Sequence, residues 1–211
     1  MSHLLRLMLL LCFAITLSAQ FGADTVSVEE LRKPLKGKAL HLLLTAQEHL
    51  RSGQRERGIE ELRRALGEPE AMPYAMSMLG SEHLRIGQLD VALHELEQAV
   101  ELLPGRPEIH SNFAYALGLK GQTERGLTEV RKALQLDAGR PKTRLVLGML
   151  LLQQGAHDAE ALKHLEAAAE EIPDAHLVLA KHYDLAGKAR EAENERRAYT
   201  IVSMGLVAGS K

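Results

Sequence analysis

Residues 73–106 read PYAMSMLGSEHLRIGQLDVALHELEQAVELLPGR, and this stretch decides the fold. Its first half places four side chains at i, i+3, i+4 and i+7, a spacing that lines up one face of a helix. A turn at 85–88 separates this helix from a second amphipathic run, which ends before Pro104 because proline cannot continue a helix. Two helices joined by a short turn form an αα-hairpin. The four side chains of the first face are Met76, Leu79, Gly80 and His83.

The chain on both sides repeats this pattern with a period of 34 residues. Many matches in phase indicate a repeat architecture, in which each hairpin buries its apolar face against its neighbours. One second-helix position falls a residue late, at Ala161, which predicts a one-residue insertion near 156–159. The small residue of the first helix recurs at Ala46, Gly80, Ala114, Gly148 and Ala180, the turn glycine at Gly53, Gly87, Gly121, Gly155 and Gly187, and the small residue of the second helix at Gly58, Ala92 and Gly126.

This pattern resembles the tetratricopeptide repeat (TPR) family. Each unit of that family has a large residue, a leucine-glycine pair and a second large residue, followed later by an alanine, a large residue, another alanine and a proline. The likeness covers residues 39–199, about five units. It implies an all-α, right-handed superhelical solenoid of helix-turn-helix units at 39–72, 73–106, 107–140, 141–172 and 173–204. The residues that carry it in the clearest unit are Met76, Leu79, Gly80, His83, Ala92, Leu96, Ala99 and Pro104.

Composition agrees with a helical fold. The 211 residues are 45% hydrophobic and only 3% aromatic, with no Trp, which favours helices over a β-sandwich or barrel. The net charge of −2 gives no reason to expect a nucleic-acid partner, because such partners usually require a basic face.

The first 19 residues are predicted to be a signal peptide. Arg6 precedes an apolar run at 7–17 that is too short to span a bilayer, and Ala19 offers a cleavage site. The protein is therefore expected to be secreted or periplasmic. Leu17 stands where a small residue is usual, so the alternative is a membrane anchor formed by the uncleaved segment. Cys12 is the only cysteine, which leaves the mature chain without a disulfide or a thiolate site.

The ends of the solenoid are also predicted. Residues 20–38 are expected to form a lead-in segment, and residues 205–211 a flexible tail. The lead-in has two alternatives: a short helix that ends before Pro34, or a long helix that runs to Arg51 with Pro34 in its first turn. In the last unit Arg196 stands where the second helix of other units carries a large apolar residue. This substitution predicts a polar outer face, which a terminal repeat requires.

No catalytic motif stands apart from the repeats, so the sequence predicts no enzyme and no cofactor. His157, Glu160 and His164 have a spacing that can share a helix face, but the HExxH zinc signature is absent. We interpret these three residues as a solvated helix face and predict no metal site.

Three units carry a polar residue where the family usually has a large apolar one, at His110, Arg144 and His176. Stacking would bring the three side chains into a row. Two interpretations stay open: the row contacts a small anion or carboxylate more strongly when histidine is protonated, or each side chain packs its stem and leaves its polar end in water.

The resemblance also implies a binding face, because first helices line the concave wall in proteins similar to this one. The implied function is an extracytoplasmic scaffold that binds a protein or peptide in this groove, with Asn112 presenting an amide to a bound peptide backbone. The Lys, Asn and Arg array of chaperone-binding members is missing. The alternative is a structural protein that self-assembles as a homo-oligomer. The implied partner-binding residues are Leu43, Gln47, Ser77, Ser81, Ser111, Asn112, Tyr115, Leu145, Met149, Leu177 and Lys181.

Overall fold

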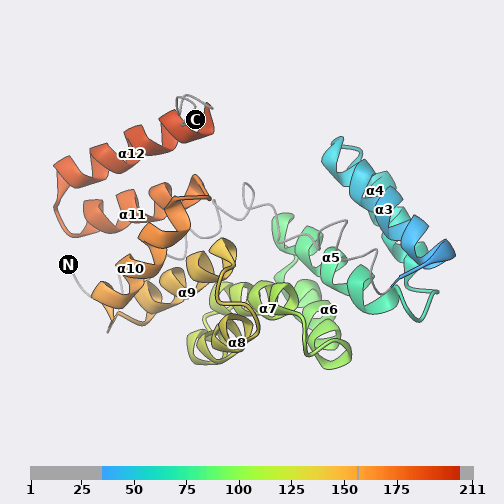
Figure 1. Cartoon of the computed structure of the whole chain (residues 1–211). Helices are drawn as coiled ribbons and strands as arrows, with labels where there is room; N and C mark the ends of the chain where they lie inside the picture. Colours follow the sequence, from blue (N-terminus) through green and yellow to red (C-terminus); the bar gives the residue numbers. More distant parts are fainter. Residues whose placement is uncertain (1–34, 156, 205–211) are drawn as a thin grey trace.

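The computed structural model describes residues 35–155 and 157–204, and within them it consists of α-helices without a strand (Figure 1). The all-α prediction is therefore confirmed. The predicted signal peptide, most of the lead-in and the tail at 205–211 lie outside the described residues. The helices are α3 (Gly37–Arg51), α4 (Arg55–Ala65), α5 (Met72–Arg85), α6 (Leu89–Leu102), α7 (Pro107–Leu119), α8 (Thr123–Leu136), α9 (Pro141–Gln154), α10 (Asp158–Ala169), α11 (Asp174–Leu185) and α12 (Ala189–Ser203).

Consecutive helices pair into hairpins, and each hairpin packs on the next through its second helix. The pairs are α3 with α4, α5 with α6, α7 with α8, α9 with α10, and α11 with α12. Figure 1 shows the hairpins following one another along an arch, with α3 and α4 at one end and α11 and α12 at the other. Helix α7 lies on the inner side of the arch and α8 on its outer side. This arrangement is the solenoid that the repeat pattern predicts.

A glycine in the left-handed conformation closes each hairpin turn. Gly87 has a φ of +78°, a conformation that side chains with a Cβ rarely adopt. The following residue, Gln88, donates its backbone N–H to the carbonyl of His83 at 2.8 Å, which satisfies a carbonyl at the end of α5. The recurring turn glycines of the sequence therefore mark helix ends.

The two helices of a hairpin cross at a pair of small residues. In the second hairpin a Cβ built on Gly80 would lie 3.2 Å from the carbonyl oxygen of Ala92 on the opposite helix. In each of the first four hairpins one member of the pair is glycine and the other is alanine, so only one methyl group fits between the backbones. The pairs are Ala46 with Gly58, Gly80 with Ala92, Ala114 with Gly126, and Gly148 with Ala161.

The last of the described hairpins has a polar second helix. Ala192 is the buried residue of α12, and Arg196 on the same helix donates to both carboxylate oxygens of Asp184, at 2.7 and 2.9 Å. At the place of Arg196 the second and fourth hairpins carry the fully buried Leu96 and Leu165. The prediction of a polar terminal face is therefore confirmed.

Candidate partner-binding face

The residues predicted to bind a partner lie on α3, α5, α7, α9 and α11, the first helices of the five hairpins. They differ in burial. Tyr115, Met149, Leu177 and Lys181 are half-buried and belong to the third, fourth and fifth hairpins. The other predicted residues are buried: Leu43, Gln47, Ser77, Ser81, Ser111, Asn112 and Leu145. The role of the whole set in binding stays a prediction, and its part-exposed members lie in the C-terminal half of the arch.

Polar members of this set connect neighbouring hairpins. The Asn112 amide on α7 donates to the Ser81 hydroxyl on α5 at 3.2 Å, and Ser81 in turn donates to the carbonyl of Ser77 at 2.8 Å. Sequence reasoning assigned the Asn112 amide to a peptide backbone, whereas the structure uses one of its N–H groups to join two hairpins. The Ser111 hydroxyl is buried and has no hydrogen-bond partner among the described residues.

Tyr115 lies at the boundary between two parts of the apolar core. It packs against the cluster built around α6 and α7, which contains Leu96 and Leu117, and against the larger cluster of α8 to α11. Burial raises the pKa of the Tyr115 phenol well above its ordinary value, so the hydroxyl is neutral at physiological pH. Met149 and Leu177 pack against the same larger cluster.

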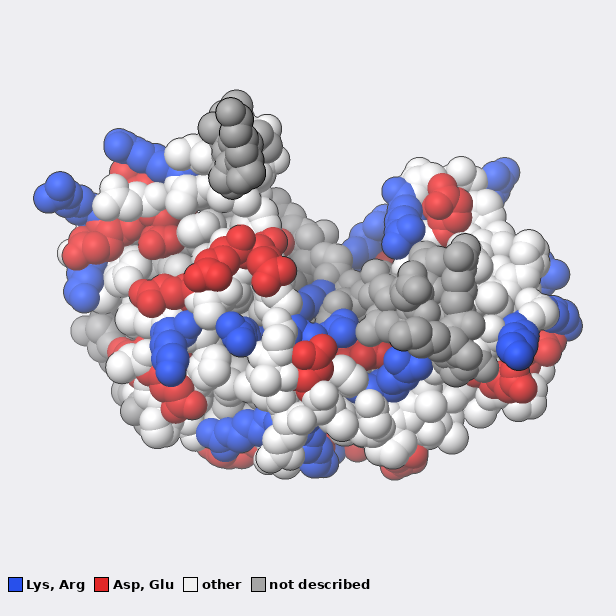
Figure 2. Space-filling model, in the orientation of Figure 1, with Lys and Arg blue, Asp and Glu red and all other residues white. Residues whose placement is uncertain are grey.

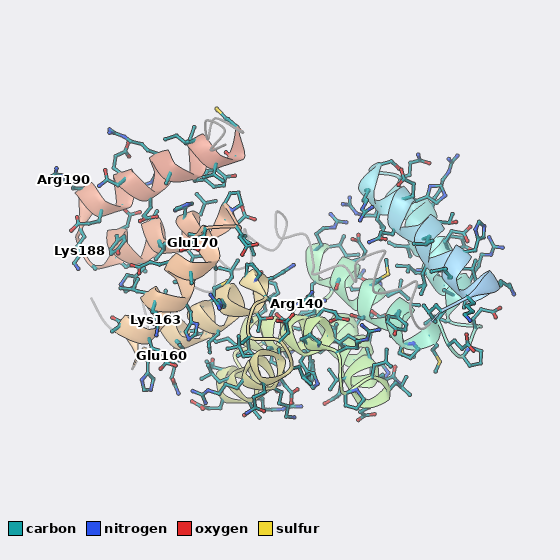
Figure 3. The ribbon with its side chains drawn as sticks, in the orientation of Figure 1. Arg140, Glu160, Lys163, Glu170, Lys188 and Arg190 are labelled. Atoms are coloured by element: carbon teal, nitrogen blue, oxygen red, sulfur yellow. The ribbon has the colours of Figure 1, made fainter. Side chains whose placement is uncertain are left out.

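Charged side chains of both signs lie along the arch (Figure 2). Arg106, just before α7, donates to the Tyr74 hydroxyl at 2.8 Å and lies 5.4 Å from the centre of its ring. Figure 2 shows acidic side chains gathered across the C-terminal arm of the arch. Figure 3 places Glu170 in this arm, and Arg140 lies at the base of the arch. A partner bound between the arms would therefore meet acidic and basic groups along one path.

His110, Arg144 and His176 each bond to another part of the protein. The Nδ1 atom of His110 lies 2.7 Å from Glu129 Oε2, and Nδ1 of His176 lies 2.7 Å from Glu195 Oε2. The Arg144 guanidinium donates to the carbonyl of Ala138 at 3.0 and 3.2 Å. The two histidines each join the two helices of a hairpin, and Arg144 holds the start of α9 to the connection after α8. Contact of this row with an anion stays a prediction.

The sequence contained one signal for these ion pairs that was missed. Each of the two glutamates follows its histidine by 19 residues, a spacing that links the first helix of a hairpin to the second. A third pair lies in the second hairpin, where His83 Nδ1 on α5 is 2.6 Å from Glu95 Oε2 on α6. These two residues are 12 positions apart in the sequence. Histidine and glutamate therefore act here as inter-helix contacts.

The described part of the chain contains no group of three or more His, Cys, Asp or Glu residues placed to hold a metal ion. His157 Nδ1 lies 4.0 Å from Glu160 Oε2, and both side chains are about half exposed. Desolvation lowers the pKa of the nearby His164, although Glu160 works in the opposite direction. Among the described helices none is both long enough and apolar enough to cross a membrane.

The sequence matches the tetratricopeptide repeat family over residues 43–107, 77–141 and 112–176, which together span more than half of the chain. A search of curated protein sequences finds no match. Solved structures with a similar fold include a thermophilic TPR protein of Thermus thermophilus, with a TM-score of 0.66 and 21% identity over 74% of this chain and 87% of that one.

Two further structures extend the comparison. MamA from Desulfovibrio magneticus has a TM-score of 0.60 and 14% identity over 82% of this chain and 99% of that one. YrrB, described as a TPR protein with an unusual peptide-binding site, has a TM-score of 0.54 and 18% identity over 82% of this chain and 92% of that one. At these identities the likeness concerns the fold alone.

Proposed function

Because this chain belongs to the tetratricopeptide repeat family, whose fold serves as a scaffold for protein–protein interaction, we propose that it binds a protein or peptide in its concave groove. The observation that carries the proposal is the series of part-exposed side chains Tyr115, Met149 and Leu177 on three successive first helices. We further propose that the protein is a non-enzymatic scaffold that works outside the cytoplasm.

The chemistry of this series favours an apolar segment with polar neighbours as the partner. Tyr115 and Met149 occupy equivalent places in adjacent hairpins, and Lys181 occupies the corresponding place in the next one. A bound helix or extended strand would bury the ring and the thioether, while the Tyr115 hydroxyl and the Lys181 ammonium would fix its register. The unusual peptide-binding site of YrrB, a protein of similar fold, supports a peptide as the kind of partner.

Location outside the cytoplasm rests on the predicted signal peptide at residues 1–19. Cell fractionation of the full-length chain, followed by determination of its N-terminal residue, tests this part of the proposal. An N-terminus at Gln20 in the soluble envelope fraction supports export and cleavage. A full-length protein in the membrane fraction supports the uncleaved anchor instead.

The groove is tested by using residues 20–211 as bait in an envelope extract, beside a Tyr115→Ala/Met149→Lys variant whose fold is checked by circular dichroism. The matched control is Leu102→Ala/Leu136→Lys, because both leucines are 46% exposed and lie on the second helices α6 and α8. A protein retained by the wild type and the control, but lost by the groove variant, supports the proposal. Equal retention by all three places the site elsewhere, and a mass that rises with concentration supports self-assembly.

A further inference from the structure

The joints between hairpins two, three and four are held by an equivalent hydrogen bond. The side chain of His110, near the start of α7, places Nε2 2.8 Å from the carbonyl oxygen of Pro104. One repeat later, Arg144 near the start of α9 donates to the carbonyl of Ala138. Each carbonyl lies two residues beyond the end of the preceding helix, where the helix dipole favours a cation. Histidine and arginine therefore occupy the same structural position at successive joints.

The second nitrogen of the His110 ring also faces an acceptor. Nδ1 lies 2.7 Å from Oε2 of Glu129 on α8, whose other oxygen accepts from Lys132 at 2.8 Å. Burial works to raise the pKa of Glu129, but the hydrogen bonds from Lys132 and His110 outweigh it and lower that pKa below its ordinary value. Glu129 is therefore an ionised carboxylate, which accepts hydrogen bonds and donates none.

The two hydrogen-bond acceptors determine the protonation state of the His110 ring. A carbonyl and a carboxylate are both acceptors, so each ring nitrogen of His110 must carry a hydrogen to satisfy them. The His110 side chain is only 4% exposed, which keeps water from replacing either partner. Glu129 and Lys132 on α8 are the charged groups paired at this position. Arg106 in the α6–α7 connection donates to Tyr74 and lies 3.9 Å from the buried Glu108 of α7.

We propose that the joint between the second and third hairpins is proton-dependent, with protonated His110 holding the start of α7 to both Pro104 and Glu129. The neutral ring has one N–H and leaves one of these acceptors facing a nitrogen lone pair. Arg144 makes the next joint independent of pH in this range because a guanidinium stays charged. One joint of the arch therefore loosens as the proton leaves, while its neighbour does not.

The hydrogen bonds of His110 determine how the free energy of unfolding changes with pH. Histidine in an unfolded chain titrates near pH 6.5. The folded joint uses both ring N–H groups, so the stability that it adds is expected to fall as the pH rises from 5.5 to 8. The unfolding equilibrium constant is expected to rise with pH by up to about tenfold per pH unit from this one site.

His176 is the matched control within the chain. It occupies the equivalent place on α11 and pairs with Glu195 in the way that His110 pairs with Glu129, but its Nε2 has no hydrogen-bond partner among the described residues. A neutral ring with hydrogen on Nδ1 satisfies this arrangement. Nitrogen-15 NMR of the full chain at pH 7 is therefore expected to show both ring nitrogens of His110 protonated and only one nitrogen of His176 protonated.

The second measurement is urea unfolding of the full chain between pH 5.5 and 8, for the wild type, His110→Arg and His176→Arg. His110→Arg is expected to lose the pH dependence of the joint, whereas His176→Arg keeps it. A neutral His110 ring in the NMR spectra overturns the proposal on the wild type alone, whatever the variants do. An unfolding slope that is the same in the wild type and in His110→Arg overturns it as well.

Discussion

Replacing Gly148 by alanine is expected to destabilise the fourth hairpin, although alanine is the better helix former. Gly148 lies in the middle of α9 where α10 crosses it. A Cβ at this position would lie 2.6 Å from Cγ and 2.9 Å from Cδ2 of Leu165, and 3.0 Å from the carbonyl oxygen of Ala161. The first contact is to the branch point of a fully buried leucine and the last is to backbone, so no flexible end can turn aside.

The expected magnitude follows from two opposing effects. Overpacking of a close-packed core costs about 1–3 kcal/mol, and contact with a branch point and a backbone oxygen places this substitution in the upper half of that range. The change from glycine to alanine in a helix interior returns about 1 kcal/mol. The net loss for Gly148→Ala is therefore about 1–2 kcal/mol in the free energy of unfolding.

Urea unfolding of the full chain, followed by circular dichroism, measures this loss. Gly105→Ala is the control, because a Cβ on Gly105 meets nothing within 4 Å, and it should leave stability unchanged or raise it slightly. In a Leu165→Ala background the two contacts to Leu165 disappear and only the 3.0 Å approach to the Ala161 carbonyl oxygen remains, so Gly148→Ala should cost less there than with Leu165 in place. A Gly148→Ala protein as stable as the wild type with Leu165 in place would refute the idea that this glycine is required by helix crossing.

Three further substitutions are assessed by the same unfolding measurement. Thr143→Val removes a buried hydroxyl that has no hydrogen-bond partner in the described part of the chain, so stability should rise by about 1 kcal/mol; a loss would show that the hydroxyl is satisfied in solution. Ala99→Leu overpacks a fully buried position on α6 and should cost about 1–3 kcal/mol, and an unchanged melting temperature would contradict this packing. Tyr74→Phe removes the acceptor of the Arg106 hydrogen bond and should cost about 1 kcal/mol, whereas no loss would show that the bond adds nothing.

The fold was predictable from the sequence because its determinants are local and repeat. A glycine such as Gly87 reports a helix end through its own backbone conformation, and Gly80 reports a helix crossing through the absence of a side chain. Neither requires knowledge of distant residues. Hairpins in a solenoid pack mainly on their neighbours, so a period of 34 residues is enough to predict the architecture.

The candidate site was less predictable because its details depend on contacts between hairpins. The partner of Asn112 is Ser81, which lies 31 residues away, and no local pattern marks one as the donor to the other. Ser111 and Leu145 were placed on the concave face by their repeat position, yet both are fully buried. Repeat position gives the face of a helix, whereas burial depends on how closely the next hairpin approaches.

In the last hairpin the residue types at the helix crossing and at the buried leucine position depend on each other. It has alanine on both crossing helices, Ala180 and Ala192, and it carries Arg196 in place of the buried leucine. In the second hairpin a methyl group on Gly80 would lie 2.7 Å from Leu96 Cγ. With alanine at position 92 of the second helix, a leucine at position 96 therefore requires glycine at position 80 of the first helix. An arginine whose head group bonds to Asp184 at the surface avoids this conflict.

This relation predicts that Arg196→Leu does not stabilise the last hairpin by itself, because the leucine would collide with the Ala180 methyl. Combined with Ala180→Gly, the same leucine should recreate the packing of the second hairpin. The coupling between the two changes in a double-mutant cycle is expected to be about 1–2 kcal/mol in favour of the pair. Additive effects in the measured unfolding free energies would show that the last hairpin accommodates leucine by moving α12.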